Sequence, residues 1–262
     1  LLLTYHHADE ITDGVNWNGF TFKSIQVLCA DGTVNHTFGY TTKGNATHEM
    51  TCTLCGYAAT EACSGGEGTA TCINRKVCDL CQAPYGELNP NNHAAETYTN
   101  GFLDCCGKVY EPATGSGTES DPYKIGNAGQ LYWFAQQVNG GNTAIHGKLV
   151  KNILINENVL AQDGTLNEGQ FRAWTPMGNK EIQYTGTFDG DGKTISGLYF
   201  NDSAASDVGL FSYVGNGGIV KNVGIQDSYV SGRSYVGGVV GYNFGTVMGC
   251  DNSGIVTATG DC

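Results

Sequence analysis

The sequence predicts a mostly β protein in which small cysteine-rich modules precede a β-solenoid whose first turn is covered by one α-helix. Three observations carry this prediction. The 262 residues include 39 glycines and 5 prolines, and only 15% are charged, which is typical of short strands joined by tight turns. Nine of the eleven cysteines lie between Cys29 and Cys106. The C-terminal part repeats short apolar runs at a nearly constant spacing, which indicates stacked repeats.

The charge and the chain ends limit the partners. A formal net charge of −12 without a basic stripe argues against nucleic acid and against an anionic membrane surface. No run approaches the roughly 18 apolar residues that a membrane span needs, so we expect no membrane insertion. No signal peptide is visible, and the sequence stops inside a repeat, so we expect a fragment of a longer protein.

The N-terminal residues 1–35 carry the weakest signal. Alternation in "FTFKSIQVL" indicates one strand, which fits the end of a preceding β domain. Residues 36–113 form the Cys/His-rich part. Its stretch "HEMTCTLC", residues 48–55, begins like the His-Glu-x-x-His signature of zinc proteases but has Cys52 in place of the second histidine. Because that catalytic site needs two histidines one helical turn apart, we expect a structural site here instead.

Two ligand sets of three cysteines and one histidine each can be drawn from the spacing. They are His48, Cys52, Cys55 and Cys63, followed by Cys72, Cys78, Cys81 and His93. Each set contains Cys-x2-Cys, and four protein ligands leave no open position for water, so the sets predict two structural zinc ions and no catalytic residue. Disulfides are the alternative, because secreted proteins ordinarily oxidise their thiols. No partner is assigned to Cys29, Cys105, Cys106 or Cys262.

Residues 114–122 are rich in Gly, Ser and Thr and predict a linker. After it, residues 123–125 predict a short strand and residues 128–138 an amphipathic helix. Asn127 is the expected N-cap, and the apolar residues recur at helical spacing from Leu131 to Val138 before a stop at residues 139–141. This helix would cover the open edge of the first turn.

The repeat is clearest where residues 208–232 match residues 236–260 at an offset of 28 that slips by one. An earlier partial copy aligns Ile195 with Val220, at an offset of 25. Each copy is too short to bury its own apolar face, so consecutive copies must stack. We therefore expect a solenoid over residues 123–262 that is truncated at its C-terminus.

Two features of this part allow a second interpretation. Asp189 and Asp191 in "FDGDGK" are typical of tight turns, although a carboxylate pair or a calcium ligand set is the alternative. Aromatic residues such as Trp174, Tyr213 and Tyr242 are typical of a packed core, although an exposed row of them would bind sugars.

The runs "GLFSYVG" and "GGVVGYNFGTV", with "WTPMGN" and "YTGTFDGDGKTISGLYF" before them, resemble the GLUG repeat region of large bacterial surface proteins, including IgA-protease-type metallopeptidases. The resemblance covers residues 118–262. It implies a right-handed β-helix, an extracellular or cell-wall-attached location and a supporting or adhesive role. Residues 48–113 are similar to metal-binding modules of gut Firmicutes surface proteins. Those modules carry Cys-x2-Cys where this chain has residues 103–106, which argues against a third site.

The leading hypothesis is a non-catalytic stalk or adhesive segment of a secreted or wall-attached bacterial protein, with a host protein, a glycan or other domains of its own chain as partner. The first alternative is an accessory region of an IgA-protease-like metallopeptidase whose catalytic domain lies outside this sequence. The second alternative is a carbohydrate-active β-helix protein, which would need two carboxyl groups about 5–9.5 Å apart.

Overall fold

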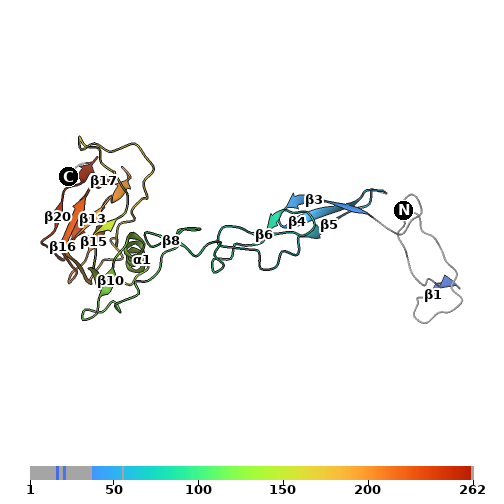
Figure 1. Cartoon of the computed structure of the whole chain (residues 1–262), viewed down its shortest axis with the longest axis horizontal. Coiled ribbons are helices and arrows are strands. Elements are labelled where there is room, and N and C mark those ends of the chain that lie inside the picture. Colours follow the sequence, from blue (N-terminus) through green and yellow to red (C-terminus); the bar gives the residue numbers. More distant parts are fainter. Residues whose placement is uncertain (1–15, 18–19, 22–36, 55, 261–262) are drawn as a thin grey trace. The chain divides into compact units, whose positions relative to one another are not determined.

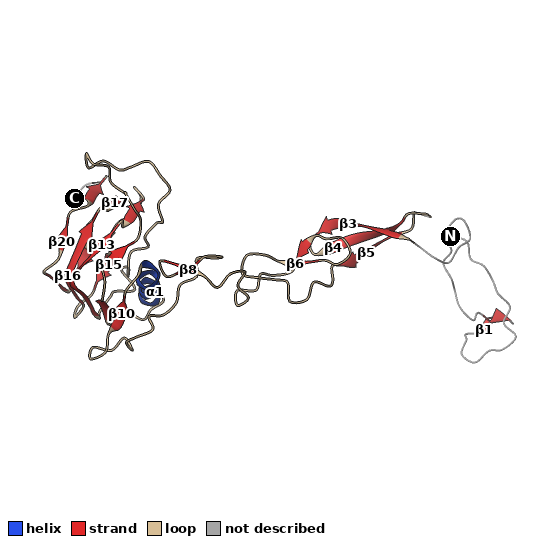
Figure 2. Cartoon of the chain, viewed as in Figure 1, coloured by secondary structure: helices blue, strands red, loops and turns tan. Residues whose placement is uncertain are grey.

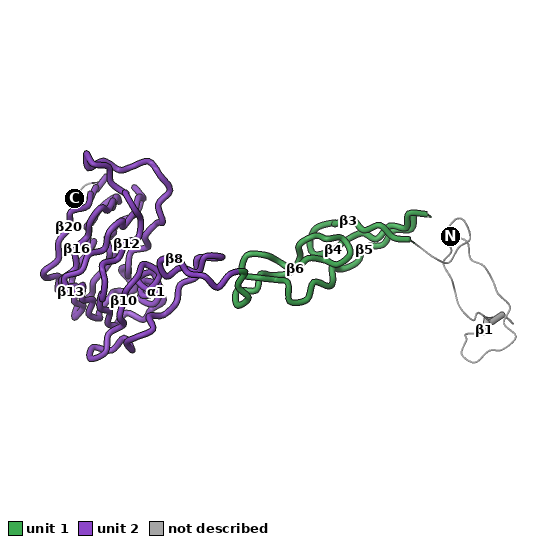
Figure 3. The backbone as a smooth tube through the Cα atoms, in the orientation of Figure 1, with its two compact units in different colours: residues 1–94 green, residues 95–262 purple. Residues whose placement is uncertain are grey.

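The structure is a computed structural model that describes residues 16–17, 20–21, 37–54 and 56–260. The chain divides into two compact units, residues 1–94 and residues 95–262 (Figure 3). Strands dominate both units, and the described residues contain one α-helix (Figure 2). The mostly β class predicted from composition is confirmed.

The interpretation of residues 1–35 falls largely outside the described residues. Within that range the structure describes two short antiparallel strands, β1 (Asn16–Trp17) and β2 (Phe20–Thr21). The strand expected across "FTFKSIQVL" is described only at its first two residues. Cys29, Cys55 and Cys262 also lie outside the described residues.

The first unit is built on an antiparallel three-stranded sheet. Its strands β3 (Phe38–Gly44), β4 (Thr47–Cys52) and β5 (Ala58–Ala62) follow one another in the sheet as they do in the sequence. Asn45 and Ala46 both have positive φ, 49° and 57°, as the tight turn of a two-residue hairpin requires. A second, short hairpin joins β6 (Lys76–Val77) to β7 (Pro84–Tyr85).

The second unit opens with a hairpin, β8 (Tyr98–Thr99) and β9 (Phe102–Leu103), turned by Asn100 and Gly101 at φ 51° and 82°. Residues 114–122, predicted as a linker, are hydrogen-bonded to neighbouring segments of this unit. The Lys124 amide donates to the Thr114 carbonyl at 2.9 Å, and the His146 amide donates to the Gly117 carbonyl at 2.8 Å.

The helix α1 (Ala128–Asn139) has the predicted cap and buried face. The Asn127 side chain accepts a hydrogen bond from the Gln130 amide, and the apolar residues predicted to share one face are buried. Phe134 from this face packs against Phe188, with ring centroids 5.7 Å apart.

Parallel pairing organises the rest of the second unit (Figure 1). The largest sheet runs β10, β11, β13, β16, β19, with β12 and β20 paired to its longer strands; a second sheet runs β14, β17, β21; a third pairs β15 with β18. The strands of the largest sheet are β10 (Tyr123–Ile125), β11 (Gly147–Leu149), β12 (Ile153–Leu154), β13 (Thr187–Ser196), β16 (Ile219–Gln226), β19 (Thr246–Met248) and β20 (Asp251–Asn252). The others are β14 (Tyr199–Asn201), β15 (Phe211–Val214), β17 (Tyr229–Gly232), β18 (Val240–Asn243) and β21 (Ile255–Ala258).

Pairing follows the later predicted repeat and departs from the earlier one. Val208 faces Val236, 28 residues on, as predicted. Ile195 faces Ile225, 30 residues on, so its predicted alignment with Val220 was wrong. The cause is an irregularity between Asp189 and Lys193 in β13, which lengthens this copy, and sequence matching alone had no means of placing it.

The core of the second unit is a continuous cluster between the helix and the three sheets. Its largest fully buried side chains include Trp174, Tyr184, Phe134, Phe188 and Phe211. The aromatic residues are thus mostly in the core, as their typical use in strand-rich proteins predicts.

Candidate metal centres

Four side chains of the first unit converge in what we call the His48 group. Its members are His48, Cys63, Cys78 and Cys81, whose ligand atoms all lie within 4.8 Å of one another. His48 and Cys78 are completely buried, at 0% exposed, and the other two are partly buried. Three sulfurs and one imidazole nitrogen thus face a single point.

Strand pairing brings the first two members together. His48 lies directly opposite Glu61 in the β4–β5 pair, and Cys63 follows the end of β5. The Tyr40 ring, on the other side of β4, contacts the imidazole edge-on at 5.3 Å and limits its rotation. His48 and Cys63 are therefore fixed by a sheet, which is a rigid support for a metal site.

The other two members sit on a tight turn after β6. The Cys78 carbonyl accepts from the Gln82 amide at 3.0 Å, which closes the Cys-x2-Cys turn. The Asp79 amide donates to the Ser64 carbonyl at 3.1 Å, and this bond holds the turn beside the segment that carries Cys63. Gly66 lies against this turn at φ 59°, where an added Cβ would be 2.3 Å from the Val77 carbonyl oxygen.

The distances inside the His48 group match a tetrahedral ion. The sulfurs of Cys63 and Cys81 are 3.8 Å apart, and the Cys78 sulfur is 3.6 Å from His48 Nδ1. Zinc bonds of about 2.3 Å to sulfur and about 2.0–2.1 Å to nitrogen in a tetrahedron place two sulfurs about 3.8 Å apart, and a sulfur and a nitrogen about 3.6 Å apart. A disulfide would need about 2.05 Å between sulfurs.

The thiols of this group differ in their proton affinity. Hydrogen bonds from backbone amides, that of Cys81 foremost, lower the pKa of Cys78 to about 6, so its thiolate is populated at neutral pH. Desolvation, followed by the hydrogen bond with Cys81, raises the pKa of Cys63 to about 12. Thiolate is the form that binds metal, so Cys78 is ready to bind and Cys63 must lose a proton.

The second imidazole nitrogen of His48 also fits a ligand. Nε2 is buried and has no hydrogen-bond partner among the described residues. A Glu61 carboxylate oxygen lies 3.8 Å from it, too far for a hydrogen bond but in the right direction. Metal-bound histidines usually donate their other N–H to a carboxylate or carbonyl. Glu61 is therefore the natural outer partner of His48.

A second set, the Cys72 group, contains Cys72, His93, Cys105 and Cys106, again with all ligand atoms within 4.8 Å. The Cys72 amide donates to the Asn92 carbonyl at 2.8 Å, which places Cys72 next to His93. Cys105 and Cys106 follow β9 in a turn closed by the Gly107 amide and the Leu103 carbonyl at 2.6 Å.

The structure partitions the predicted ligands differently from the sequence spacing. Six of the eight predicted residues lie in the two groups, namely His48, Cys63, Cys72, Cys78, Cys81 and His93. Cys52 is buried at the far end of β4, four residues from His48, and a strand rise of about 3.3 Å per residue separates them by about 13 Å. Cys55 lies outside the described residues, so a role for Cys52 with Cys55 stays a prediction.

Sequence reasoning missed Cys105 and Cys106 because they are adjacent rather than two residues apart. The available signal was the order of ligands, since a thiol pair is the last element of both groups. The exchange of Cys78 and Cys81 from the predicted second set to the His48 group follows from the Asp79–Ser64 bond, which spacing cannot reveal.

Both groups have a donor set that suits zinc. Three thiolates and one imidazole form a closed set without a position for water, the pattern of structural rather than catalytic zinc. The described cysteines form no disulfide. Each group could therefore hold one metal ion.

Comparison with known proteins gives distant relatives. The chain is 29% identical to halomucin of Haloquadratum walsbyi over 202 residues, which are 77% of this chain and 2% of that protein. It is 28% identical to a putative Gly-rich membrane protein of Evansella cellulosilytica over 138 residues, 52% of this chain and 15% of that protein. The chain thus spans a small fraction of the length of either relative.

No family model matches the chain, and no solved structure matches it. In the described part of the chain, no helix has the length and apolar character needed to cross a bilayer. What the chain resembles, at a distance, is short segments of far longer proteins, one of which is described as a membrane protein.

Proposed function

We propose that the chain is a non-catalytic structural segment of a large secreted or cell-wall-attached bacterial surface protein. Zinc-stabilised modules precede a right-handed β-solenoid, which supplies an extended stalk or adhesive surface. The observation that carries the proposal is the closed donor set of the His48 group, whose 3.8 Å and 3.6 Å separations suit a structural zinc ion. The distant relatives support a place within a longer, membrane-associated protein.

The parallel pairing supports the solenoid. Equivalent residues recur at 26 to 32 residues in successive strands, from Tyr229 opposite Ile255 to Thr187 opposite Ile219. Tyr213 stacks on Tyr242 one repeat later, with centroids 4.8 Å apart and an angle of 11°. Parallel crossovers are right-handed in nearly all proteins, which favours a right-handed coil. A solenoid lengthens by adding repeats, as a stalk requires.

The carboxylates that an enzyme would need are engaged elsewhere. Asp191 pairs with Lys148 at 2.9 Å, and Asp189 pairs with Lys221 at 3.3 Å. The hydrogen bond from Lys148 lowers the pKa of Asp191. A glycosidase needs a carboxyl group with a raised pKa as its acid, so this pair favours a structural role.

Metal analysis tests the proposal. Protein purified without reducing agent or chelator should contain zinc bound to both groups, with the corresponding thiols protected from alkylation until a chelator is added. Chelation should unfold the Cys/His-rich part and leave the circular dichroism of the parallel sheets. A metal-free protein with oxidised cysteines and an unchanged fold would contradict the proposal and support disulfides.

A further inference from the structure

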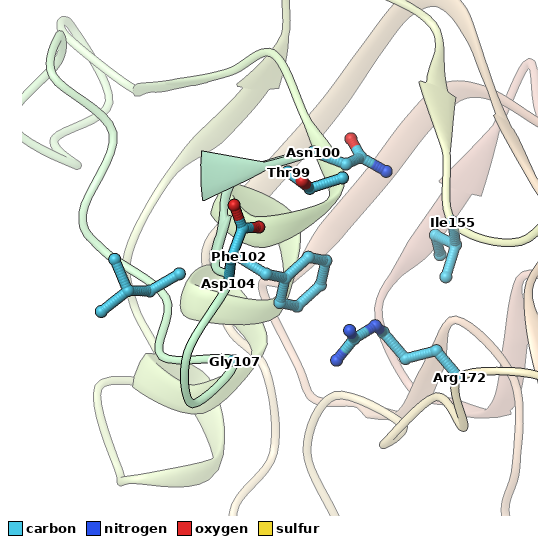
Figure 4. Close-up of a pocket in the computed structure, with 8 residues that line it drawn as sticks. Thr99, Asn100, Phe102, Asp104, Gly107, Ile155 and Arg172 are labelled. Carbon is cyan, nitrogen blue, oxygen red and sulfur yellow. The ribbon is translucent and has the colours of Figure 1, made fainter. Parts of the chain in front are cut away.

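A pocket of about 320 Å³ lies in the second unit, apart from the sulfur and imidazole ligands. The β8–β9 hairpin forms one wall with Thr99, Phe102 and Asp104, and Ile155 and Arg172 form the other (Figure 4). Ligand pockets have volumes of about 300–1,000 Å³, so this one suits a ligand about the size of one sugar ring.

Arg172 is held in place for binding. Its amide donates to Asn156 Oδ1 at 2.7 Å, and Asn156 Nδ2 donates back to the Arg172 carbonyl at 3.0 Å. The guanidinium carbon lies 3.8 Å from the centroid of the Phe102 ring. A guanidinium group stacked on a ring keeps its N–H donors in its own plane, where they remain available to a ligand.

The ring beneath Arg172 is itself fixed. Phe102 is 7% exposed and contacts Tyr132 edge-on at 5.2 Å, and Tyr132 contacts the buried Trp174 at 5.0 Å. The Tyr132 hydroxyl donates to the Ala173 carbonyl at 2.8 Å. Burial raises the pKa of Tyr132, so it stays neutral beside the arginine. This aromatic chain joins the pocket floor to the core.

The charge of Arg172 is not neutralised within the described part of the chain. Its guanidinium forms none of the ion pairs found there. This is notable in a chain with 25 acidic and 13 basic residues. On the other side of the pocket, the Asp104 carboxylate is hydrogen-bonded to the side chains of Thr97 and Thr99 and presents further acceptor positions.

We propose that this pocket binds a sugar unit that carries a carboxylate, such as a uronic acid. Arg172 would take the carboxylate through paired N–H donors, which is the geometry that guanidinium groups favour. Asp104 would accept hydrogen bonds from sugar hydroxyls. Phe102 and Ile155 would contact the C–H groups of the ring. The pocket thus offers one group for each part of an acidic sugar.

Binding of sodium D-glucuronate, measured by ligand-observed NMR and by calorimetry on the whole chain, tests the proposal. A ligand of this size should bind with a Kd of about 1–10 mM. The variant Arg172→Gln should weaken binding at least about ten-fold, as loss of a charge-assisted pair predicts. Arg233→Gln, which alters an exposed arginine outside the pocket, should leave binding unchanged.

Two further probes define the chemistry. Neutral D-glucose should bind at least about ten-fold more weakly than glucuronate, because it lacks the carboxylate. Glycine, a carboxylate with an ammonium group and no sugar ring, should also bind more weakly. Equal binding of glucose or stronger binding of glycine would overturn the proposal, as would no glucuronate binding by a variant-free protein whose circular dichroism shows the native fold. Arg172→Lys, which keeps the charge without the planar fork, should lie between the wild type and Arg172→Gln.

Discussion

Replacing Cys63 by serine tests the partition of ligands in the His48 group. The structure gives each of its four residues one ligand atom within 4.8 Å of the others, so Cys63→Ser removes one of four metal bonds. Structural zinc sites bind with about 10–16 kcal/mol in all. An even share of about 2.5–4 kcal/mol, at about 1.4 kcal/mol per factor of ten, lowers zinc affinity about 10²–10³-fold.

The assay must report on this group alone. We would follow the imidazole nitrogens of His48 by long-range proton–nitrogen NMR while a chelator competes for zinc. In the wild type, Nδ1 should show the shift of a metal-bound nitrogen, because it faces the Cys78 sulfur at 3.6 Å. Cys63→Ser should lose this shift at a far lower chelator concentration.

The matched control is Cys52→Ala. Cys52 belongs to the predicted set but lies at the other end of β4 from His48. Cys52→Ala should therefore leave the His48 Nδ1 signal metal-bound at the wild-type chelator concentration. If Cys52→Ala released His48 as readily as Cys63→Ser does, the partition drawn from the structure would be refuted.

Three further predictions concern one outer contact, one turn and one ion pair. Glu61→Ala should lower the zinc affinity of the His48 group about 10–100-fold in chelator competition, because metal-bound histidines depend on such outer partners. Gly197→Ala should cost about 2–5 kcal/mol of unfolding free energy in urea, since φ is +78° and an added Cβ would lie 1.9 Å from the Asn156 carbonyl oxygen. Asp191→Asn should lower stability at about pH 7 and lose this effect toward about pH 2, because Lys148 lowers the folded pKa, and the stability so gained is present above the unfolded pKa and lost as pH falls through the folded one.

Each of these predictions has its own control or contradicting result. Glu49→Ala, on the other face of β4 and paired with Lys43, should leave zinc affinity unchanged. Gly192→Ala, at φ +71° with no atom within 4 Å of an added Cβ, should cost only about 1–2 kcal/mol. An Asp191→Asn protein whose stability followed the wild type at every pH would contradict the role given to the Lys148 pair.

Local signals predicted the local features well. The cap at Asn127 and the buried face of α1 depend on neighbours within one helix, and both are where the sequence places them. The pairing of Val208 with Val236 follows from a repeat without insertions. The pairing of Ile195 could not be predicted, because the irregularity in β13 changes the length of one copy without changing its pattern.

The candidate sites show the same division. Cysteine and histidine identity predicted the donor chemistry, since no other residue types supply three sulfurs and an imidazole. The partition could not be read from spacing, because His48 lies in a strand and its partner Cys63 arrives through the β4–β5 pair. Ligand spacing has the expected meaning only within one turn, as in Cys78 and Cys81.

The most direct test of structural metal in both groups is the native mass of the chain purified without chelator. The account predicts bound zinc, of which two ions are lost in the double variant Cys81→Ser, Cys106→Ser, one from each group. Each single variant should lose one. A metal-free wild-type chain, with its mass lowered by the hydrogens lost on forming disulfides, would contradict it.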